Sequence, residues 1–301
     1  MQATIYGFDS LMAGTNDVVV TGGMESMTNA PYLVPKARGG YRIGHGMLYD
    51  HMMLDGLEDA YEKGRAMGTY AEDCSSKYNF SREDQDAFAI ESVKRAQAAT
   101  ADGSFAWEIA PVTVKGRAGD VVIDKDEGPL KAKIDKISQL KPAFKKDGTI
   151  TAASSSSIND GAAALVLMRE STAKKLGAKP IAKIVAHQRH SHEPNWFTTA
   201  PIGAIKKLYK KTGWSSDQVD LFEVNEAFAA VAMAAMKEHN IPHDKINIHG
   251  GACALGHPIG ASGARIIVTL LGALKKTGGK RGVAALCIGG GEATAMAIEM
   301  M

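Results

Sequence analysis

The chain has 301 residues, 45% of them hydrophobic, which is enough for two domains with buried cores. Its 35 basic and 33 acidic residues leave a net charge of +2, so nothing in the composition requires a nucleic-acid partner. Three cysteines do not make a disulfide framework and indicate a reducing, cytoplasmic setting. No apolar run reaches membrane-spanning length and residues 1–11 lack the basic segment of an export signal, so we expect a soluble protein without a membrane partner.

The first part of the chain predicts a helix followed by a core strand. Residues 1–12 look like a helix already under way, because no capping residue precedes them. Ala13-Gly14 ends this helix, and the β-branched run 17–21 predicts a short buried strand of the kind found in parallel sheets.

Residues 29–147 have a different character and read as an inserted loop domain. Prolines and glycines make the first part irregular, and helices are then expected over 57–78 and 82–101. Ser81 is the expected N-cap of the second helix, with acidic residues in its first turn. Short strands are expected over 112–114 and 121–123, around a glycine turn.

From about Thr149 the sequence again has the pattern expected of a core domain. The four serines Ser154–Ser157 suit a flexible linker, but the hydrophobic strands expected on both sides favour a segment that lines a site. Those neighbours include a buried strand over 162–168 and a strand over 180–186, followed by an amphipathic helix over 203–212.

Asn225 and Glu226 stand where a predicted strand (220–224) meets a predicted helix (227–240). Ligands of open α/β sheets gather at the carboxyl ends of strands, so this position favours a functional site. A buried Asn-Glu pair that only ties loops together is the alternative, and it would be favoured if the pair stood alone.

The stretch from His249 to Arg265 is the most glycine-rich part of the chain. We expect a strand (246–248) before it and an apolar helix from about Ser262 after it, which places His257 near a helix N-terminus. The positive potential there keeps a histidine neutral and suits it to act as a base, although a structural hydrogen-bonding role stays open. A nucleotide-phosphate loop is disfavoured, because neither Gly-x-Gly-x-x-Gly nor a Lys-Ser/Thr ending is present.

Cys287 ends a predicted buried strand and is followed by Gly289-Gly290-Gly291, whose N–H groups can hold an oxyanion. A cysteine in an apolar strand is usually inert packing, so a reactive and a structural reading compete here. Residues 284–293 also echo residues 17–26, and this repeat predicts a duplicated α/β unit.

Taken together, three motifs resemble the thiolase family, and within it the acetyl-CoA acetyltransferases. They are Asn225-Glu-Ala-Phe228, Gly250-Gly-Ala-Cys-Ala-Leu-Gly-His-Pro-Ile-Gly-Ala-Ser-Gly263 and Cys287-Ile-Gly-Gly-Gly291, supported by Gly22-Gly-Met-Glu-Ser-Met27 and Met67-Gly-Thr-Tyr-Ala-Glu72. The resemblance implies an α/β fold with a duplicated α-β-α core and an inserted loop domain. Its expected parts are residues 1–28 and 149–167 of the first core half, the loop domain 29–148 with coenzyme A and oligomer contacts, and the second core half 168–301.

The resemblance also implies roles for single residues. His257 would activate the family's nucleophilic cysteine and help form an oxyanion hole, in which Asn225 would hold a water. Cys287 would take the α-proton of acetyl-CoA, and the amide of Gly289 would serve a second oxyanion hole. Contacts to the acyl-CoA substrate are expected from five further residues: Met67, Phe144, Ser156, Ala227 and Phe228.

The implied reaction is the condensation of two acetyl-CoA molecules to acetoacetyl-CoA and CoA, or thiolytic cleavage of a 3-ketoacyl-CoA, as part of fatty acid metabolism. No metal ion and no cofactor are implied, since the coenzyme A thioester is the substrate, and the family is usually a homodimer or homotetramer.

The chain departs from the family pattern at three places. The family's Cys-Gly-Ser-Gly nucleophile loop would stand immediately before Met1, so we expect the first core half to be incomplete, and a catalytically incomplete CoA-binding protein is the alternative function. Ser154–Ser157 replaces the usual Asn-Ala-Ser-Gly, and Ala66 stands where many biosynthetic relatives have histidine. A ketoacyl-synthase type of condensing enzyme is disfavoured, because such enzymes do not use a second cysteine as Cys287 would be used.

Overall fold

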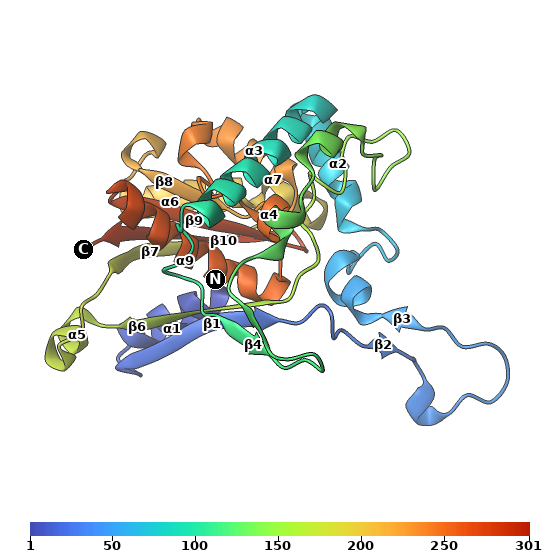
Figure 1. Cartoon of the computed structure of the whole chain (residues 1–301), viewed down its shortest axis with the longest axis horizontal. Helices are drawn as coiled ribbons and strands as arrows, with labels where there is room; N and C mark the ends of the chain where they lie inside the picture. Colours follow the sequence, from blue (N-terminus) through green and yellow to red (C-terminus); the bar gives the residue numbers. More distant parts are fainter.

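A computed structural model describes residues 1–301, and its centre is a four-stranded sheet in the order β7-β10-β9-β8 (Figure 1). These strands are β7 (Ala182–Ser191), β10 (Glu292–Met300), β9 (Arg281–Ile288) and β8 (Leu221–Val224). Only β8 and β9 run parallel; the other neighbours are antiparallel. The strands β8, β9 and β10 are buried almost throughout, as expected for a sheet that is covered on both faces.

A second, smaller sheet pairs β1 (Val18–Glu25) with β6 (Gly161–Met168), in a register that runs from Val18 opposite Met168 to Glu25 opposite Gly161. Strands are present at both predicted places, 17–21 and 162–168, but the predictions that they are buried, and that the first belongs to a parallel sheet, are wrong. The two strands are antiparallel, and alternate residues face solvent, as Val20 (71% exposed) and Val166 (64%) show. Their inner residues, such as Thr21 and Leu167, face the helices and are buried.

Helices α1 (Gln2–Met12) and α9 (Ile259–Thr277) form the layer between the two sheets. α9 contacts β1 and β6 on one side and β8 and β9 on the other, and its apolar face meets Ile5 of α1 in one core cluster with strands β9 and β10. Helices α6 (Ala200–Thr212) and α7 (Ala229–His239) pack against the opposite face of the four-stranded sheet in the largest core cluster. The result is a mixed α/β layering with α1 and α9 at its centre.

The predicted duplication is visible in the order of elements. α1 leads into β1, which pairs antiparallel with β6, and α9 leads into β9, which pairs antiparallel with β10. The copies differ in what joins the paired strands. Three glycines connect β9 to β10, whereas the whole segment from Ser26 to Asp160 lies between β1 and β6.

The segment between β1 and β6 holds the elements predicted for a loop domain. It contains β2 (Tyr32–Leu33), β3 (Tyr49–Asp50), α2 (Met67–Tyr78), α3 (Arg82–Ala101), β4 (Val112–Val114), β5 (Val121–Ile123) and α4 (Glu127–Lys131). The predicted Ser81 N-cap is confirmed, with a capping box between Ser81 and Asp84. The arm that carries β2 and β3 extends away from the rest of the molecule (Figure 1).

The predicted helix over 57–78 is wrong in its first part. A π-helical turn over Met53–Leu57 is followed by a loop in which Gly64 has a φ of +85°, and α2 begins only at Met67. Asp59 holds this loop by accepting hydrogen bonds from the backbone N–H groups of Tyr61 and Glu62. This local carboxylate–backbone bonding competes with helix formation.

The predicted strand over 246–248 is also wrong, since only Ile246 forms a bridge, to Phe222 of β8. Asn247 has a φ of +48°, which interrupts an extended strand. Its side-chain amide takes over the pairing, because it accepts from the N–H of Val224 at 2.9 Å and donates to the C=O of Val224 at 2.9 Å.

The remaining elements are short and complete the connections between the layers. They are the helices α5 (Glu170–Leu176) and α8 (Ala252–Leu255) and the 3-10 turns η1 (Ala37–Gly39), η3 (Ile134–Gln139), η4 (Pro194–Thr199), η5 (Ser216–Gln218) and η6 (His243–Lys245). None of the helices combines the length and the apolar character that crossing a membrane requires.

Candidate active site

The carboxyl ends of β8 and β9 bring two predicted site residues to the same edge of the sheet. Because the strands are parallel, Asn225, just after β8, lies beside the end of β9, and its N–H donates to Ala285 at 3.0 Å. Cys287 is the last buried residue of β9. The chain then reverses through Gly290 (φ +103°) and Gly291 (φ +93°), a conformation that favours glycine.

His257 reaches this edge from the loop between α8 and α9. The preceding Gly256 has a φ of +88°, and a Cβ there would lie 2.0 Å from the side chain of Asn159, so both the backbone and the space require glycine. The N–H of His257 donates to the C=O of Ser157 at 3.0 Å. These contacts fix where the imidazole enters the site.

A cavity of about 320 Å³ lies at this edge and gathers most of the predicted residues. Its lining includes His257, Cys287, Gly289, Met67, Ser156, Ala227 and Phe228. Other parts of the wall come from Gly22, Gly56, Leu57, Phe197, Ile259, Gly260, Gly263, Leu286, Ile288, Thr294 and residues 1–3. Its size and largely apolar wall, with few polar groups, are typical of a small-molecule site.

Two predicted residues stand just behind the wall. Asn225 is 1% exposed and places its side-chain nitrogen 3.4 Å from Nε2 of His257, while its Oδ1 is buried without a protein partner. Phe144 packs edge-on against Phe228, with ring centroids 5.8 Å apart, and its ring leaves no space for a Cβ at Gly68. Phe144 therefore supports the wall of the cavity.

Burial controls the charge of His257. It lowers the pKa of the imidazole to about 4, and the positive charge of Arg265 on α9 adds to the effect. The sequence predicted a neutral histidine because of the positive potential at a helix N-terminus. The structure also favours the neutral form of His257, but burial is the larger cause. At neutral pH the ring therefore has an unprotonated nitrogen that can accept a proton.

Glu226 has the loop-tying role that the sequence left open as the alternative for the Asn-Glu pair. Its carboxylate accepts hydrogen bonds from Ser92 Oγ (2.7 Å), the Asn247 side chain (2.8 Å) and the N–H of Cys253 (3.0 Å). These partners lie on α3, between η6 and α8, and in α8. Glu226 thus ties loops together, while its neighbour Asn225 faces His257.

All three cysteines are free thiols whose pKa values are raised by burial. The pKa of Cys287 rises to about 12 and that of Cys74 to about 11, and the pKa of Cys253 is also raised, by burial and by the carboxylate of Glu226. All three are therefore protonated at neutral pH in this state. Cys287 is the one of the three that lines the cavity.

The four serines form part of the framework of the site. Ser155 bridges to Phe228, and both the N–H and the hydroxyl of Ser156 donate to the C=O of Ala227, at 3.1 and 3.0 Å. Ser154 accepts from the N–H of Ala229 at 2.8 Å. The prediction that this segment lines a site, and is no flexible linker, agrees with these contacts.

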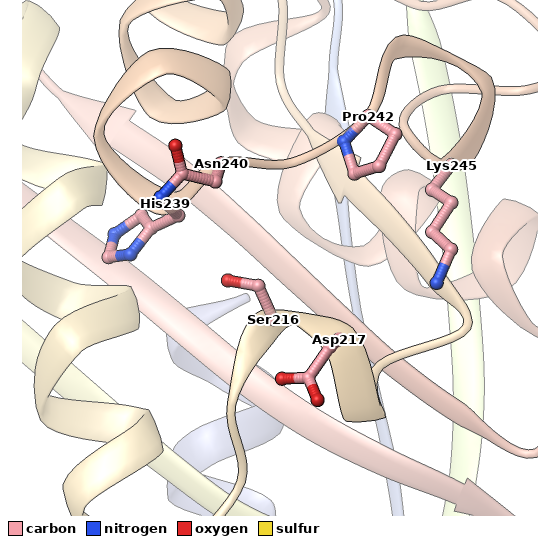
Figure 2. A pocket seen from close by; sticks show the side chains of 6 residues that line it. All are labelled: Ser216, Asp217, His239, Asn240, Pro242 and Lys245. Carbon is pink, nitrogen blue, oxygen red and sulfur yellow. The ribbon is translucent and has the colours of Figure 1, made fainter.

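A second, larger cavity of about 440 Å³ lies away from these residues and has a different character (Figure 2). Six residues line it, none of them hydrophobic: Ser216, Asp217, His239, Asn240, Pro242 and Lys245. Lys245 donates to the C=O of Val219 and His239 contacts the C=O of Ile202, so both side chains already have protein partners. With no apolar wall, this cavity is a poor candidate for a thioester site.

Some residues of the site could not be recognised as functional from the sequence. Ser262 was noted only as a helix start, yet its Oγ lies 2.6 Å from Nδ1 of His257. The buried pair of Arg265 and Glu223, 3.5 Å apart, lies behind the site and influences His257 through its charge. Phe197 reaches the cavity from a 3-10 turn far along the chain, and no local pattern predicts that approach.

Comparisons with known proteins indicate the family of the chain. The N-terminal domain of thiolase matches residues 1–171, and its C-terminal domain matches residues 178–300. The chain is 49% identical over 302 residues to acetyl-CoA acetyltransferase IA of Candida tropicalis and 48% identical over 304 residues to acetyl-CoA acetyltransferase 2 of Arabidopsis thaliana. Those alignments cover 99% and 100% of this chain and 75% of each relative.

Two solved structures are also similar to the whole chain. The crystal structure of the Bacillus anthracis acetyl-CoA acetyltransferase superposes with a TM-score of 0.96 at 40% identity, and Acat5 thiolase from Ascaris suum in complex with coenzyme A with a TM-score of 0.93 at 43% identity. Each match covers 100% of this chain and 76% of the other.

Proposed function

Because the chain belongs to the thiolase family, we propose that it acts as an acetyl-CoA acetyltransferase, which condenses two acetyl-CoA molecules to acetoacetyl-CoA and CoA or catalyses the thiolytic reverse. The names of its relatives support this substrate. The observation that carries the proposal is the shared cavity of His257, Cys287 and Gly289, with Asn225 hydrogen-bonded to His257.

The chemical problem is the removal of a proton from the carbon next to a thioester. The C–H bond breaks, the proton goes to a base, and the electron pair moves onto the thioester oxygen, where it needs hydrogen-bond donors. We assign the base to Cys287 and one donor to the amide of Gly289, its near neighbour on the cavity wall. The raised pKa of the thiol suits it to return this proton in the reverse direction, and its thiolate, once formed, is a strong base.

His257 and Asn225 are assigned to the other thioester. His257 is neutral at pH 7 and can take a proton from a nucleophile, and it can then stabilise an oxyanion with the proton that it holds. The unpartnered, buried Oδ1 of Asn225 suits the proposed role of holding a water at this oxyanion hole.

The acyl-carrying role is assigned to none of the three cysteines. Cys74 is fully buried within α2, Cys253 faces Glu226, and Cys287 has the proton-transfer role. The raised pKa values of all three thiols disfavour a resting nucleophilic thiolate.

Binding of the acyl-CoA chain is assigned to the wall formed by Met67, Ser156, Ala227 and Phe228, with Phe144 in support. The division into core halves at 1–28, 149–167 and 168–301, around a loop domain at 29–148, is kept as part of the proposal. The pairing of β1 with β6 across the intervening segment supports it.

We further propose a homo-oligomer, with a homotetramer as the expected form. The β2–β3 arm exposes apolar side chains, including Ile43 (99% exposed), Met47 (64%) and Leu48 (63%), and contact with another copy would bury them. A cytoplasmic role in fatty acid metabolism completes the proposal, and the three free thiols fit a reducing compartment.

The test is hydrogen exchange at the methyl group of acetyl-CoA in deuterated buffer, followed by mass spectrometry. This step needs the base and its oxyanion donor but no acyl-enzyme, so it tests the assignments of Cys287 and Gly289 directly. We expect exchange with the wild-type chain, and condensation is then measured as acetoacetyl-CoA formation. Binding of acetyl-CoA without exchange and without condensation would favour the alternative, a CoA-binding protein without turnover.

A further inference from the structure

We propose that Ser262 is a positioning residue that fixes His257 in the tautomer with its proton on Nδ1, so that Nε2 is the unprotonated nitrogen of the ring. This inference rests on the proposed function for its catalytic consequence. The hydrogen-bond geometry that carries it stands independently.

Ser262 lies in the first turn of α9 and is fully buried. Its Oγ lies 2.6 Å from Nδ1 of His257 and 2.9 Å from the C=O of Pro258. A hydroxyl has one proton to donate, and a carbonyl oxygen can only accept. If both contacts are hydrogen bonds, the hydroxyl donates to Pro258 and the N–H at Nδ1 of His257 donates to Ser262.

The other side of the ring leads to the same assignment. The group nearest to Nε2 is the side-chain nitrogen of Asn225, at 3.4 Å, and an amide nitrogen can only donate. Nε2 must then be the acceptor, and the proton of a neutral imidazole must be on Nδ1. Asn225 and Ser262 come from different elements, yet they require the same tautomer.

The choice of a serine at this place has a further consequence. A carboxylate bonded to Nδ1 would orient the ring equally well, but its negative charge would favour the imidazolium. A hydroxyl orients the ring without that charge, and the nearby charge of Arg265 works in the same direction, towards the neutral ring. Ser262 therefore combines a fixed tautomer with a base that stays unprotonated.

The direct test is the tautomer of His257 in the full chain, read from the ring ¹⁵N shifts of histidine-labelled protein and assigned by the loss of its signals in His257→Gln. In the wild type we expect Nδ1 protonated and Nε2 unprotonated. A wild-type ring protonated on Nε2 would overturn the proposal, and this measurement requires neither activity nor a variant at Ser262.

The variant Ser262→Ala removes the acceptor and introduces no bulk. We expect its His257 signals to change to the Nε2-protonated form or to a mixture of tautomers. Acetoacetyl-CoA formation should fall by about 10- to 100-fold, in line with the loss of other groups that orient a histidine, while the Kd for acetyl-CoA stays within about twofold. Ser262→Thr, which keeps the hydroxyl, should retain the wild-type tautomer.

Thr277→Ala is the matched control, because Thr277 donates to the C=O four residues earlier in the same helix, at 2.9 Å, as Ser262 does. It should change neither the His257 shifts nor the rate of acetoacetyl-CoA formation. Unchanged shifts and an unchanged rate of acetoacetyl-CoA formation in Ser262→Ala would show that the hydroxyl only caps the helix. Absence of exchange in the wild type would count against the proposed function, while the ¹⁵N shifts would still decide the role of Ser262.

Discussion

The side-chain nitrogen of Asn225 lies 3.4 Å from Nε2 of His257, although 32 positions separate them in the sequence. Asn225 follows β8 and His257 precedes α9, so the contact joins the edge of the sheet to the start of the central helix. Asn225 is almost completely buried. The pair thus defines one corner of the candidate active site.

Two substitutions of Asn225 should separate its effect on the position of the His257 ring from its effect on the charge of that ring. Asn225→Ala removes the donor to Nε2, and we expect acetoacetyl-CoA formation to fall by about 10- to 100-fold with little change in acetyl-CoA affinity. Asn225→Asp would place a negative charge beside the ring, which favours the imidazolium and raises the pKa of His257 from about 4. The acid limb of the pH–rate profile should then move to higher pH in the aspartate variant. If the limb does not move, the ionisation that controls the rate belongs to a group other than His257.

Replacing the thiol of Cys287 tests its assignment as the base. In Cys287→Ser the hydroxyl is a much weaker acid than the thiol, so we expect exchange at the acetyl-CoA methyl group to fall by orders of magnitude. The Kd for acetyl-CoA, measured by calorimetry, should change little. Cys74→Ser is the control, since Cys74 is a buried thiol of α2 that does not line the cavity. Wild-type exchange in Cys287→Ser would mean that another residue is the base.

Glu226 is expected to matter for stability more than for chemistry. Glu226→Ala leaves three donors without their partner, namely Ser92 Oγ, the Asn247 amide and the Cys253 N–H, and should cost about 3 kcal/mol in the free energy of unfolding. Ser92→Ala removes one of these bonds and should cost about 1 kcal/mol. Urea unfolding followed by circular dichroism measures both. A loss below about 1 kcal/mol for Glu226→Ala would show that the loops do not depend on this carboxylate.

The buried carboxyl groups near Arg265 predict how stability depends on pH. Burial raises the pKa of Glu223 to about 8 and that of Glu108 to about 7, against an ordinary value of 4.5. These two groups therefore bind more protons in the folded than in the unfolded state between pH 4.5 and 8, and their contribution to the free energy of unfolding should fall as pH rises through this window. Glu223→Gln keeps the group neutral and should flatten the decline.

The control for this measurement is Glu91→Gln, which removes a partly exposed carboxylate paired with Arg95 at 2.8 Å. It should leave the pH dependence above pH 5 close to that of the wild type. His257 acts in the opposite direction at lower pH, since its pKa is lowered, and its stabilising contribution is lost as pH falls from 6.5 towards 4. Identical stability profiles of the wild type and Glu223→Gln from pH 5 to 8 would contradict the raised pKa of Glu223.

The sequence was sufficient where a feature depends on neighbouring residues. The Ser81 cap, the helix over 82–101 and the strands over 112–114 and 121–123 follow from capping, periodicity and turn chemistry, and the structure has them. The motifs around Asn225, His257 and Cys287 also located three parts of one site. Strand ends and glycine loops are local features, so their positions could be read along the chain.

The tertiary structure decided which faces are buried and how the parts meet. A β-branched run does not say whether a helix covers both of its faces, and β1 proved to be exposed on one of them. Asn247 replaced a strand because its amide could reach Val224 of a separate element. Asn225 and Glu226 are adjacent in sequence, yet they face different partners. The pKa of His257 and its bond to Ser262 likewise depend on burial and on direction in space, which arise only when distant segments pack together.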